Sequence, residues 1–393
     1  MRLLGGWGRT IIAGAVAASA ALVSANVAAA APAAAATPGS VIAVDPQPSG
    51  FHGMSGGSIV DYWMTGSDGT PERASGVLFV PSGRAPSGGW PIMAFDHGTS
   101  GLGSNCGGLS SPAGAPAQEE TQEDRLLRYF VSKGFAVVAP DYLGLGRFDT
   151  GPHPYLELQT EATSTIDLVR AARAAHPELS RTWAVTGESQ GGQAALGTGH
   201  LQRTYAPDLD FRGTIAIDPE SDVEDLLPAA GPWVPNVPGL SGNGLTAFLA
   251  MSLVGLREAH PEVNVEGYLS PHGRDLLDSI GTLCLRDIID RTRNASLGDL
   301  LSRQLTTPSF RTALTSYMAV PTSGYNAPIL MLTNATDTTV PSPFHATLAA
   351  QFAANGVDFH PVVGTGEHCQ LNPRMWSAMD AFTARITSSP AKP

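Results

Sequence analysis

The stretch Gly187-Glu188-Ser189-Gln190-Gly191-Gly192 determines how the rest of the chain is interpreted. It follows a short apolar run over 182–186, and the small residues 193–196 come directly after it. A strand, a sharp turn and a helix in this order, with G-x-S-x-G at the turn, predict a serine held in a strained backbone conformation. Glycines are needed on both sides of that serine, because a Cβ there would collide with the strand or the helix.

The start of the chain is typical of a secretory signal peptide. Residues 1–36 contain Arg2 and Arg9, an apolar run from Ile11 to Val23 and Ala-rich sequence. Cleavage after Ala30, Ala31 or Ala36 fits equally well. A membrane anchor fits less well, because the apolar run is short, Ala-dominated and not repeated later in the chain. We therefore expect a secreted, extracellular protein.

Charge and cysteine content fit this location. The 393 residues carry a net charge of −12, and residues 1–36 contain two arginines and no acid, so the remainder carries −14. Such an acidic surface disfavours nucleic acid and anionic membranes as partners. Three cysteines in an oxidising compartment suggest one disulfide and one free thiol. No C-x-x-C or clustered His/Cys spacing indicates a metal site.

Strand-like runs alternate with helical patterns along most of the chain. The expected strands are 58–64, 74–80, 91–95, 135–139, 182–186, 213–217, 328–332 and 357–363, and the expected helices are 123–132, 161–175, 190–205, 342–354 and 376–386. Residues 37–54, rich in Pro, Gly and Ser, are expected to run over the surface. This alternation predicts an α/β fold, with a mostly parallel central sheet covered by helices on both faces.

The alternation stops over residues 219–325, which combine Pro-rich loops with at least three helical pieces. A connection of about a hundred residues exceeds any ordinary loop between a strand and a helix. We interpret it as a helical cap. It is inserted after the expected strand 213–217, which follows the expected helix 190–205. The cap would divide the core into residues 37–218 and 326–393.

A serine hydroxyl becomes a nucleophile when a histidine takes its proton and a carboxylate orients that histidine. After Ser189 the chain offers Asp337, which follows the strand-like run 328–332, and His368, in a glycine-rich loop after the last expected strand. All three lie where parallel strands end, which is the edge where such sheets place their sites. The sequence therefore predicts Ser189, Asp337 and His368 as a catalytic triad.

Other acids and histidines compete for these roles. Asp218 directly follows the strand 213–217 and is the alternative acid, with Glu220 a weaker one. His360 falls inside an expected strand, where we interpret it as a packed residue, and His345 falls inside an expected helix.

Two backbone N–H groups are needed for the oxyanion that forms when serine attacks. We expect them from Gln190, the residue after the nucleophile, and from Thr99 in the loop that follows the strand 91–95. The glycine-rich stretch 141–146 follows another strand and either lines the substrate pocket or is only a turn. It lacks the third glycine of a dinucleotide-binding loop.

Together these segments resemble the secretory lipase family of α/β-hydrolases, which includes fungal lipase A and many actinobacterial secreted lipases. The likeness rests on 97–99 with Cys106 close behind, 140–146, 187–192, the cap position, Asp337 and Gly366-Glu367-His368-Cys369. The resemblance implies a serine triad, hydrolysis of acyl esters and a cap that helps form the acyl-binding site. It also suggests a disulfide between Cys106 and Cys284. Glu188 departs from the family pattern, as does the stretch 217–220, which lacks the expected glycines.

The leading hypothesis is a secreted serine ester hydrolase, a lipase or carboxylesterase, that needs no metal or organic cofactor. Its partner would be a small-molecule or lipid ester, with a lipid–water interface as a candidate place of action; the sequence indicates no oligomeric state. A serine peptidase of the same fold is the nearest alternative, with Glu224, Asp225 and Glu258 available to anchor a charged peptide terminus. A secreted binding protein without catalysis is the alternative from another class.

Overall fold

The computed structural model describes residues 36–50, 52–110, 121–235 and 244–388. The signal peptide expected at residues 1–36 lies outside these ranges apart from its last residue. Within the described ranges, no helix combines the length and the apolar character required to span a bilayer.

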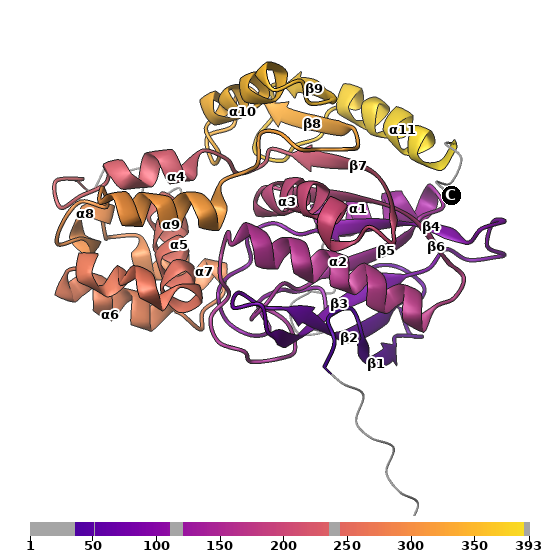
Figure 1. Ribbon diagram of the computed structural model, residues 1–393, viewed down its shortest axis with the longest axis horizontal. Coiled ribbons are helices and arrows are strands. Elements are labelled where there is room, and N and C mark those ends of the chain that lie inside the picture. The colour runs from indigo at the N-terminus through magenta and orange to yellow at the C-terminus, as the bar shows by residue number, and fades with distance from the viewer. Residues whose placement is uncertain (1–35, 51, 111–120, 236–243, 389–393) are drawn as a thin grey trace, which may run out of the picture. The chain divides into compact units, whose positions relative to one another are not determined.

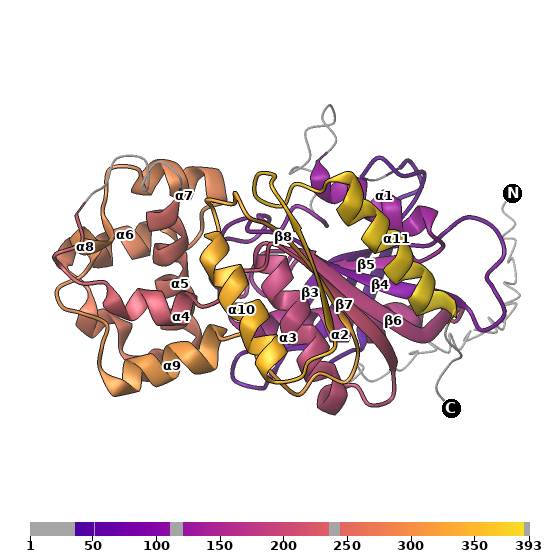
Figure 2. The same ribbon diagram turned by 90° about the horizontal axis from the view of Figure 1, so that it is seen from above.

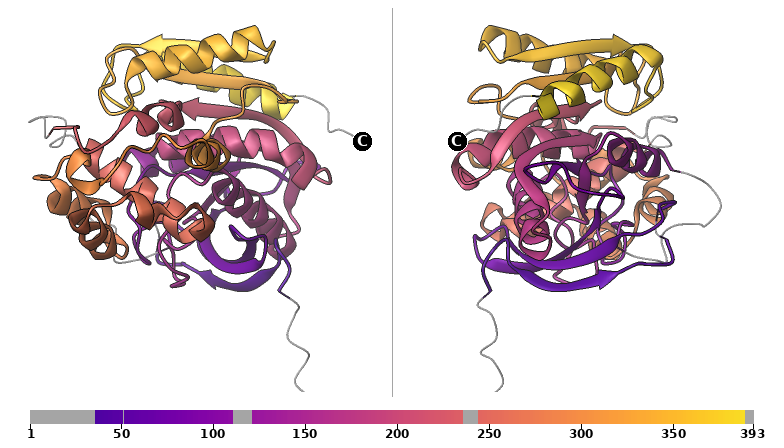
Figure 3. Two further views of the ribbon diagram at one scale, coloured as in Figure 1. Left: turned by 60° about the vertical axis from the view of Figure 1, so that its left-hand side comes forward. Right: turned by 90° about the vertical axis from the view of Figure 1, so that its right-hand side faces the viewer.

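The described residues contain one nine-stranded sheet, in the order β1-β2-β3-β5-β4-β6-β7-β8-β9. Its strands are β1 (Val41–Pro46), β2 (Ser58–Thr65), β3 (Pro71–Phe79), β4 (Trp90–Asp96), β5 (Ala136–Pro140), β6 (Leu179–Glu188), β7 (Asp210–Ile217), β8 (Ile329–Asn334) and β9 (Phe359–Gly364). Strands β1, β2, β3 and β5 pair antiparallel, and all pairs from β5 through β4 to β9 are parallel. Figure 3 shows the sheet twisting from the first strands at one edge to β9 at the other. The predicted mostly parallel sheet is confirmed.

Strand β1 differs from the sequence-based expectation, which treated residues 37–54 as surface loop. Val41–Pro46 pairs antiparallel with β2. The edge of the β2–β3 hairpin offers unpaired N–H and C=O groups, and the β-branched residues of the Val41-Ile42-Ala43-Val44 run suit a strand there.

Helices cover both faces of the sheet (Figure 2). One face carries α1 (Gln122–Ser132) and α11 (Pro373–Ser388), and the other carries α2 (Leu158–Ala175), α3 (Gln190–Tyr205) and α10 (Ser342–Ala354). Phe130 and Phe382 belong to the core on the first face, and Ile166 and Ala195 to a core on the second. The sheet is thus buried on both sides, as its continuous apolar strands predict.

Between β7 and β8 lie helices that gather beside the end of the sheet (Figure 1). They are α4 (Val223–Leu226), α5 (Leu245–Ala259), α6 (Pro271–Ile280), α7 (Leu285–Thr292), α8 (Leu297–Leu300) and α9 (Pro308–Met318), with short 3-10 turns between some of them. They share a hydrophobic core that also takes in Leu102 and Tyr155 from loops of the sheet domain. The insertion therefore has a core of its own that extends to the site-forming loops.

The insertion is also tied to the sheet domain covalently. Cys106 and Cys284 form a disulfide, and Cys369 is free and buried. Beside the disulfide, Leu102 N donates to Leu283 O at 2.9 Å and Leu285 N donates to Ser100 O at 2.9 Å. The loop after β4 is thereby fixed to the start of α7.

Replacing Cys106 and Cys284 by serine together should lower the free energy of unfolding, because the disulfide closes a loop with a sequence separation of 178. The loop-entropy model gives a loss of about 5 kcal/mol for this length. Urea unfolding followed by circular dichroism measures it, with Cys369→Ser as the control that leaves the disulfide intact. A loss below about 1 kcal/mol would contradict the expectation, since it would be far under the loop-entropy value.

Candidate active site

Ser189 occupies the turn between β6 and α3. Its φ of 56° and ψ of −123° place it in a left-handed region that side chains rarely adopt. The turn is tight on both sides: a Cβ at Gly187 would collide with the carbonyl of Gly191, and a Cβ at Gly191 would collide with that of Asp96. Ser189 N donates to Ile217 O at 2.9 Å, so neighbouring strand β7 holds the strained turn in place.

His368 and Asp337 lie together in the loops that follow β9 and β8. His368 Nδ1 is 2.6 Å from Asp337 Oδ2. The other carboxylate oxygen, Asp337 Oδ1, accepts hydrogen bonds from Thr339 N at 2.8 Å and Val340 N at 3.1 Å. His368 Nε2 is buried and has no hydrogen-bond partner among the described residues. The imidazole is therefore oriented through Nδ1 and leaves Nε2 available to a proton donor.

The charges around His368 favour its protonated form. Burial would lower the pKa of His368, but the hydrogen bond and charge of Asp337, with the charges of Asp218 and Glu220, raise it above its ordinary value. Burial alone would raise the pKa of Asp337. The hydrogen bond with His368 and the charge of His368 hold it below its ordinary value instead. An imidazolium formed during proton transfer would thus be stabilised.

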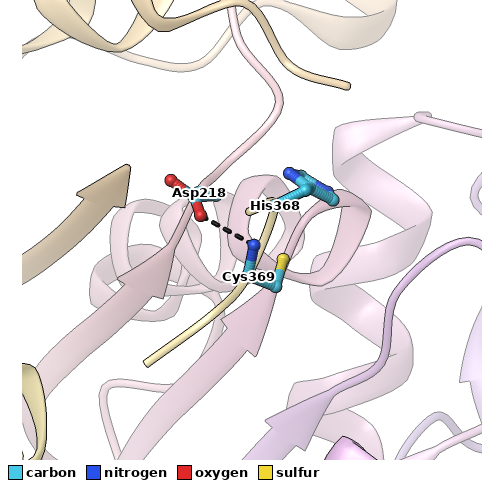
Figure 4. Close-up of side chains that lie close together, drawn as sticks. All are labelled: Asp218, His368 and Cys369. Atoms are coloured by element: carbon cyan, nitrogen blue, oxygen red, sulfur yellow. Dashed lines mark hydrogen bonds between the residues drawn. The ribbon is translucent and has the colours of Figure 1, made fainter. Parts of the chain in front are cut away.

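Asp218, the alternative acid, has a different task. Its Oδ1 accepts from Asn334 N at 2.7 Å, and its Oδ2 accepts from Asn334 Nδ2 and from Cys369 N, both at 2.8 Å. Figure 4 shows Asp218 bonded to the backbone beside His368 rather than to the imidazole. Asp218 therefore fastens the end of β8 and the loop of His368.

Among the described residues, two groups of side chains are compact enough to be considered as metal ligands: Asp218 with His368 and Cys369, and Asp218 with Asp337 and His345. In both groups the Asp218 oxygens already accept hydrogen bonds from the protein. Burial and the charge of Glu188 raise the pKa of the Cys369 thiol well above its ordinary value, whereas a metal binds thiolate. The donor set therefore fits a structural hydrogen-bond network better than a metal centre.

Gln190 and the loop that contains Thr99, the expected sources of the oxyanion donors, lie beside Ser189. Gln190 is the first residue of α3, where backbone N–H groups have no acceptor within the helix. Its buried side chain donates from Nε2 to Glu161 Oε1 at 2.7 Å, which fixes its position. The loop after β4 passes over the serine, because a Cβ built on Gly98 would lie 3.9 Å from Ser189 Cβ. Thr99 follows in the same loop.

A cleft of about 340 Å³ brings these groups together. It is lined by Gly98, Thr99, Gln122, Glu123, Glu188, Ser189, Phe248, Leu285, Thr339, His368 and Cys369. Phe248 and Leu285 come from α5 and α7, so the helical insertion supplies apolar wall to the cleft that holds the serine. The cleft thus joins the serine, the histidine and the insertion.

Glu188, whose direction the sequence left open, faces this cleft. Gln122 Nε2 donates to Glu188 Oε2 at 2.6 Å and also to Cys369 O at 2.5 Å. Burial, with the charge of Glu123, raises the pKa of Glu188 to about 7. Gln122 had no signal in the sequence, because its two partners lie 66 and 247 residues away.

The remaining candidates lie elsewhere. His345 lies in helix α10, as expected; its side chain is buried, with Nδ1 at 3.8 Å from Asp218 Oδ1. The interpretation of His360 as a packed residue is wrong: its side chain is 56% exposed, because β9 is an edge strand.

The stretch 141–146 is a supporting turn, in which Tyr142 donates to His97 O at 3.1 Å. The described residues that line the cleft do not include the three acids considered for a peptidase, Glu224, Asp225 and Glu258.

Residues 115–392 match the model of a family described as secretory lipase. The chain belongs to the secretory lipase family. Of its curated relatives, a secreted triacylglycerol lipase of Malassezia furfur is 25% identical over 186 residues, which are 44% of this chain and 31% of the relative. A probable inactive lipase of Mycobacterium tuberculosis is 24% identical over 250 residues, 62% of this chain and 53% of the relative. The chain thus spans only about a third and about half of these relatives.

Solved structures of a lipase and an esterase show the same fold. Candida antarctica lipase A superposes with a TM-score of 0.71 at 18% identity, covering 91% of this chain and 84% of that one. A rice cell wall degrading esterase of Xanthomonas oryzae gives a TM-score of 0.67 at 21% identity, covering 89% and 97%. The predicted α/β-hydrolase fold is confirmed.

Proposed function

We propose that this member of the secretory lipase family is a secreted serine ester hydrolase. Ser189 would attack the ester carbonyl, His368 would take and return the proton, and Asp337 would orient His368. The N–H groups of Gln190 and Thr99 would hold the oxyanion. Water would then hydrolyse the acyl ester on Ser189, which releases the carboxylic acid and restores the serine hydroxyl.

One observation carries this proposal. Ser189 on its strained turn and His368, whose Nδ1 is held by Asp337, line the same cleft. A serine at the start of a helix and an oriented imidazole with a free Nε2 are the two parts that activated serine chemistry needs. Membership of the family supports an ester as substrate, and the apolar side chains of Phe248 and Leu285 support an acyl chain bound against the insertion.

A fluorophosphonate probe tests the proposal, because it reacts only with an activated serine. We expect covalent labelling of Ser189 in the purified protein, located by peptide mass spectrometry. Hydrolysis of p-nitrophenyl esters from acetyl to palmitoyl then separates a lipase from a carboxylesterase. Labelling without turnover of any ester would direct the search to peptide substrates. Absence of both would contradict the proposal and place the chain with the relative described as probably inactive.

The pH dependence of the reaction should follow the raised pKa of His368. A general base must be neutral, so kcat/KM should fall as the pH decreases through the pKa of His368 and be constant above it. Because that pKa is raised, the half-maximal point should lie above the ordinary 6.5. Rates on p-nitrophenyl acetate, measured across the neutral pH range, locate this point. A half-maximal point at or below 6.5 would contradict the assignment of the surrounding charges.

A further inference from the structure

A chain of hydrogen bonds runs from the buried carboxylate of Glu220 to Thr99. Thr99 lies in the loop after β4, which is called the oxyanion loop below because it would supply an oxyanion donor. Tyr155 Oη donates to Glu220 Oε1 at 3.0 Å and is 2.9 Å from Thr99 Oγ1. Tyr155 is fully buried and Glu220 is 7% exposed. Thr99, at the other end of the chain, lines the cleft with Ser189. The hydrogen bonds thus join three segments that are far apart in the sequence.

Glu220 and Tyr155 are themselves held in place by other parts of the structure. Glu220 N donates to Ser189 O at 3.3 Å, so Glu220 is held against the nucleophile turn. Tyr155 belongs to the hydrophobic core of the helical insertion, and Tyr317 of α9 donates to Tyr155 O at 2.9 Å. Tyr155 is therefore fixed from the insertion, while its hydroxyl contacts the loop of Thr99.

The chemistry of the groups sets the direction of the protons. An ionised carboxylate only accepts hydrogen bonds, so Tyr155 must donate to ionised Glu220. Tyr155 Oη then accepts, and the donor is the hydroxyl of Thr99. At a pH above the pKa of Glu220, this fixes the Thr99 hydroxyl on Tyr155 and leaves the backbone N–H of Thr99 as the donor offered to an oxyanion.

We propose that Glu220 and Tyr155 are positioning residues, which through the Thr99 hydroxyl hold the oxyanion loop in place. The inference rests on the proposed ester hydrolysis and assigns a role to residues that do not touch the reacting atoms. Catalysis is sensitive to such placement, because oxyanion donors must be preorganised where the charge develops. Loss of the link should lower kcat and leave KM nearly unchanged.

Glu220 also lies near other titratable groups. Burial raises its pKa to about 7, an effect reduced by the bond from Tyr155 and the charge of His368 and increased by Asp337. Glu161 of α2 also interacts with it electrostatically. A variant of Glu220 would thus remove both the link and the charge that acts on His368. A variant of Tyr155 removes the link and leaves the Glu220 side chain in place, with its pKa raised further by the loss of the hydrogen bond.

The test is a double-mutant cycle on Tyr155→Phe and Thr99→Val, with kcat and KM measured on p-nitrophenyl butyrate. With Thr99 present, Tyr155→Phe should lower kcat about tenfold, the scale of a small misplacement of catalytic groups. In the Thr99→Val protein the same change should lower kcat less than about twofold, because no hydroxyl is left to hold. In the Thr99→Ser protein, which keeps a hydroxyl, Tyr155→Phe should again lower kcat by about as much as it does with Thr99 present. Tyr62→Phe is the matched control, since Tyr62 is a buried tyrosine whose hydroxyl donates to Ser164 O away from the cleft.

The outcomes separate the inference from the function on which it rests. Equal losses from Tyr155→Phe with and without the Thr99 hydroxyl, or no loss in either case, would overturn the positioning role while hydrolysis by the wild type stands. A loss confined to the melting temperature, with unchanged kcat, would overturn it as well. Absence of turnover and of fluorophosphonate labelling in the wild type would overturn the ester hydrolase and with it this role.

Discussion

Ser189→Ala is expected to lower kcat for p-nitrophenyl esters on the order of 10⁶-fold, the scale seen when the nucleophile of a serine triad is removed. In the proposed mechanism His368 and Asp337 have no nucleophile to activate once the Ser189 hydroxyl is gone, so the loss should equal that of the whole triad. Fluorophosphonate labelling should disappear at the same time. The strained turn already positions a Cβ at residue 189, and alanine keeps it, so the fold should be retained.

The measurement requires protein free of wild-type enzyme, because a trace would conceal a loss of this size. Separate expression and a thermal melt matching the wild type provide the check. Ser377→Ala, an exposed serine of α11 whose hydroxyl donates to Pro373 O, is the matched control and should leave kcat unchanged. A fall of less than about tenfold in Ser189→Ala would assign the nucleophile to another residue.

The sequence allowed prediction of the groups that come directly after regular elements. Ser189 follows a strand and opens a helix, and Asp337 and His368 follow strands that belong to the parallel part of one sheet. The carboxyl ends of parallel strands lie at one edge of the sheet. The position of each residue just after a strand was therefore enough to predict that the three residues lie close together. The pairing of Cys106 with Cys284 came from the family resemblance, and the structure contains it.

The supporting residues were not predictable in the same way. Tyr155 lies in a loop between β5 and α2, and its contacts with Thr99 and Glu220 depend on how the insertion packs. Hydrophobic period and turn signals describe single elements and carry no information on such contacts. The same limit applies to His360, which looks like any strand residue until the sheet order shows that β9 is at the edge. Glu220 was considered only as an acid for the triad, whereas its carboxylate is bonded to a tyrosine.

Asp337→Asn is expected to lower kcat about 10⁴-fold, as in other serine triads, with little change in stability. The reason lies in the two backbone donors, Thr339 N and Val340 N, which face Oδ1 at 2.8 and 3.1 Å. They would keep the amide oxygen of asparagine in that place and turn its NH₂ group toward His368 Nδ1. An amide donor there forces Nδ1 to accept, so the neutral imidazole carries its proton on Nε2 and cannot take the one from Ser189.

Asp218→Asn provides the contrast that decides which acid belongs to the triad. Three N–H groups face the Asp218 carboxylate, and an amide with one oxygen leaves at least one of them unpaired in a buried place. Each such loss costs about 1–3 kcal/mol, so Asp218→Asn should lower the free energy of unfolding measured in urea. Its kcat should fall far less than that of Asp337→Asn. The opposite result, a large loss of kcat in Asp218→Asn and a small one in Asp337→Asn, would make Asp218 the acid that orients His368, in spite of the 2.6 Å contact of Asp337.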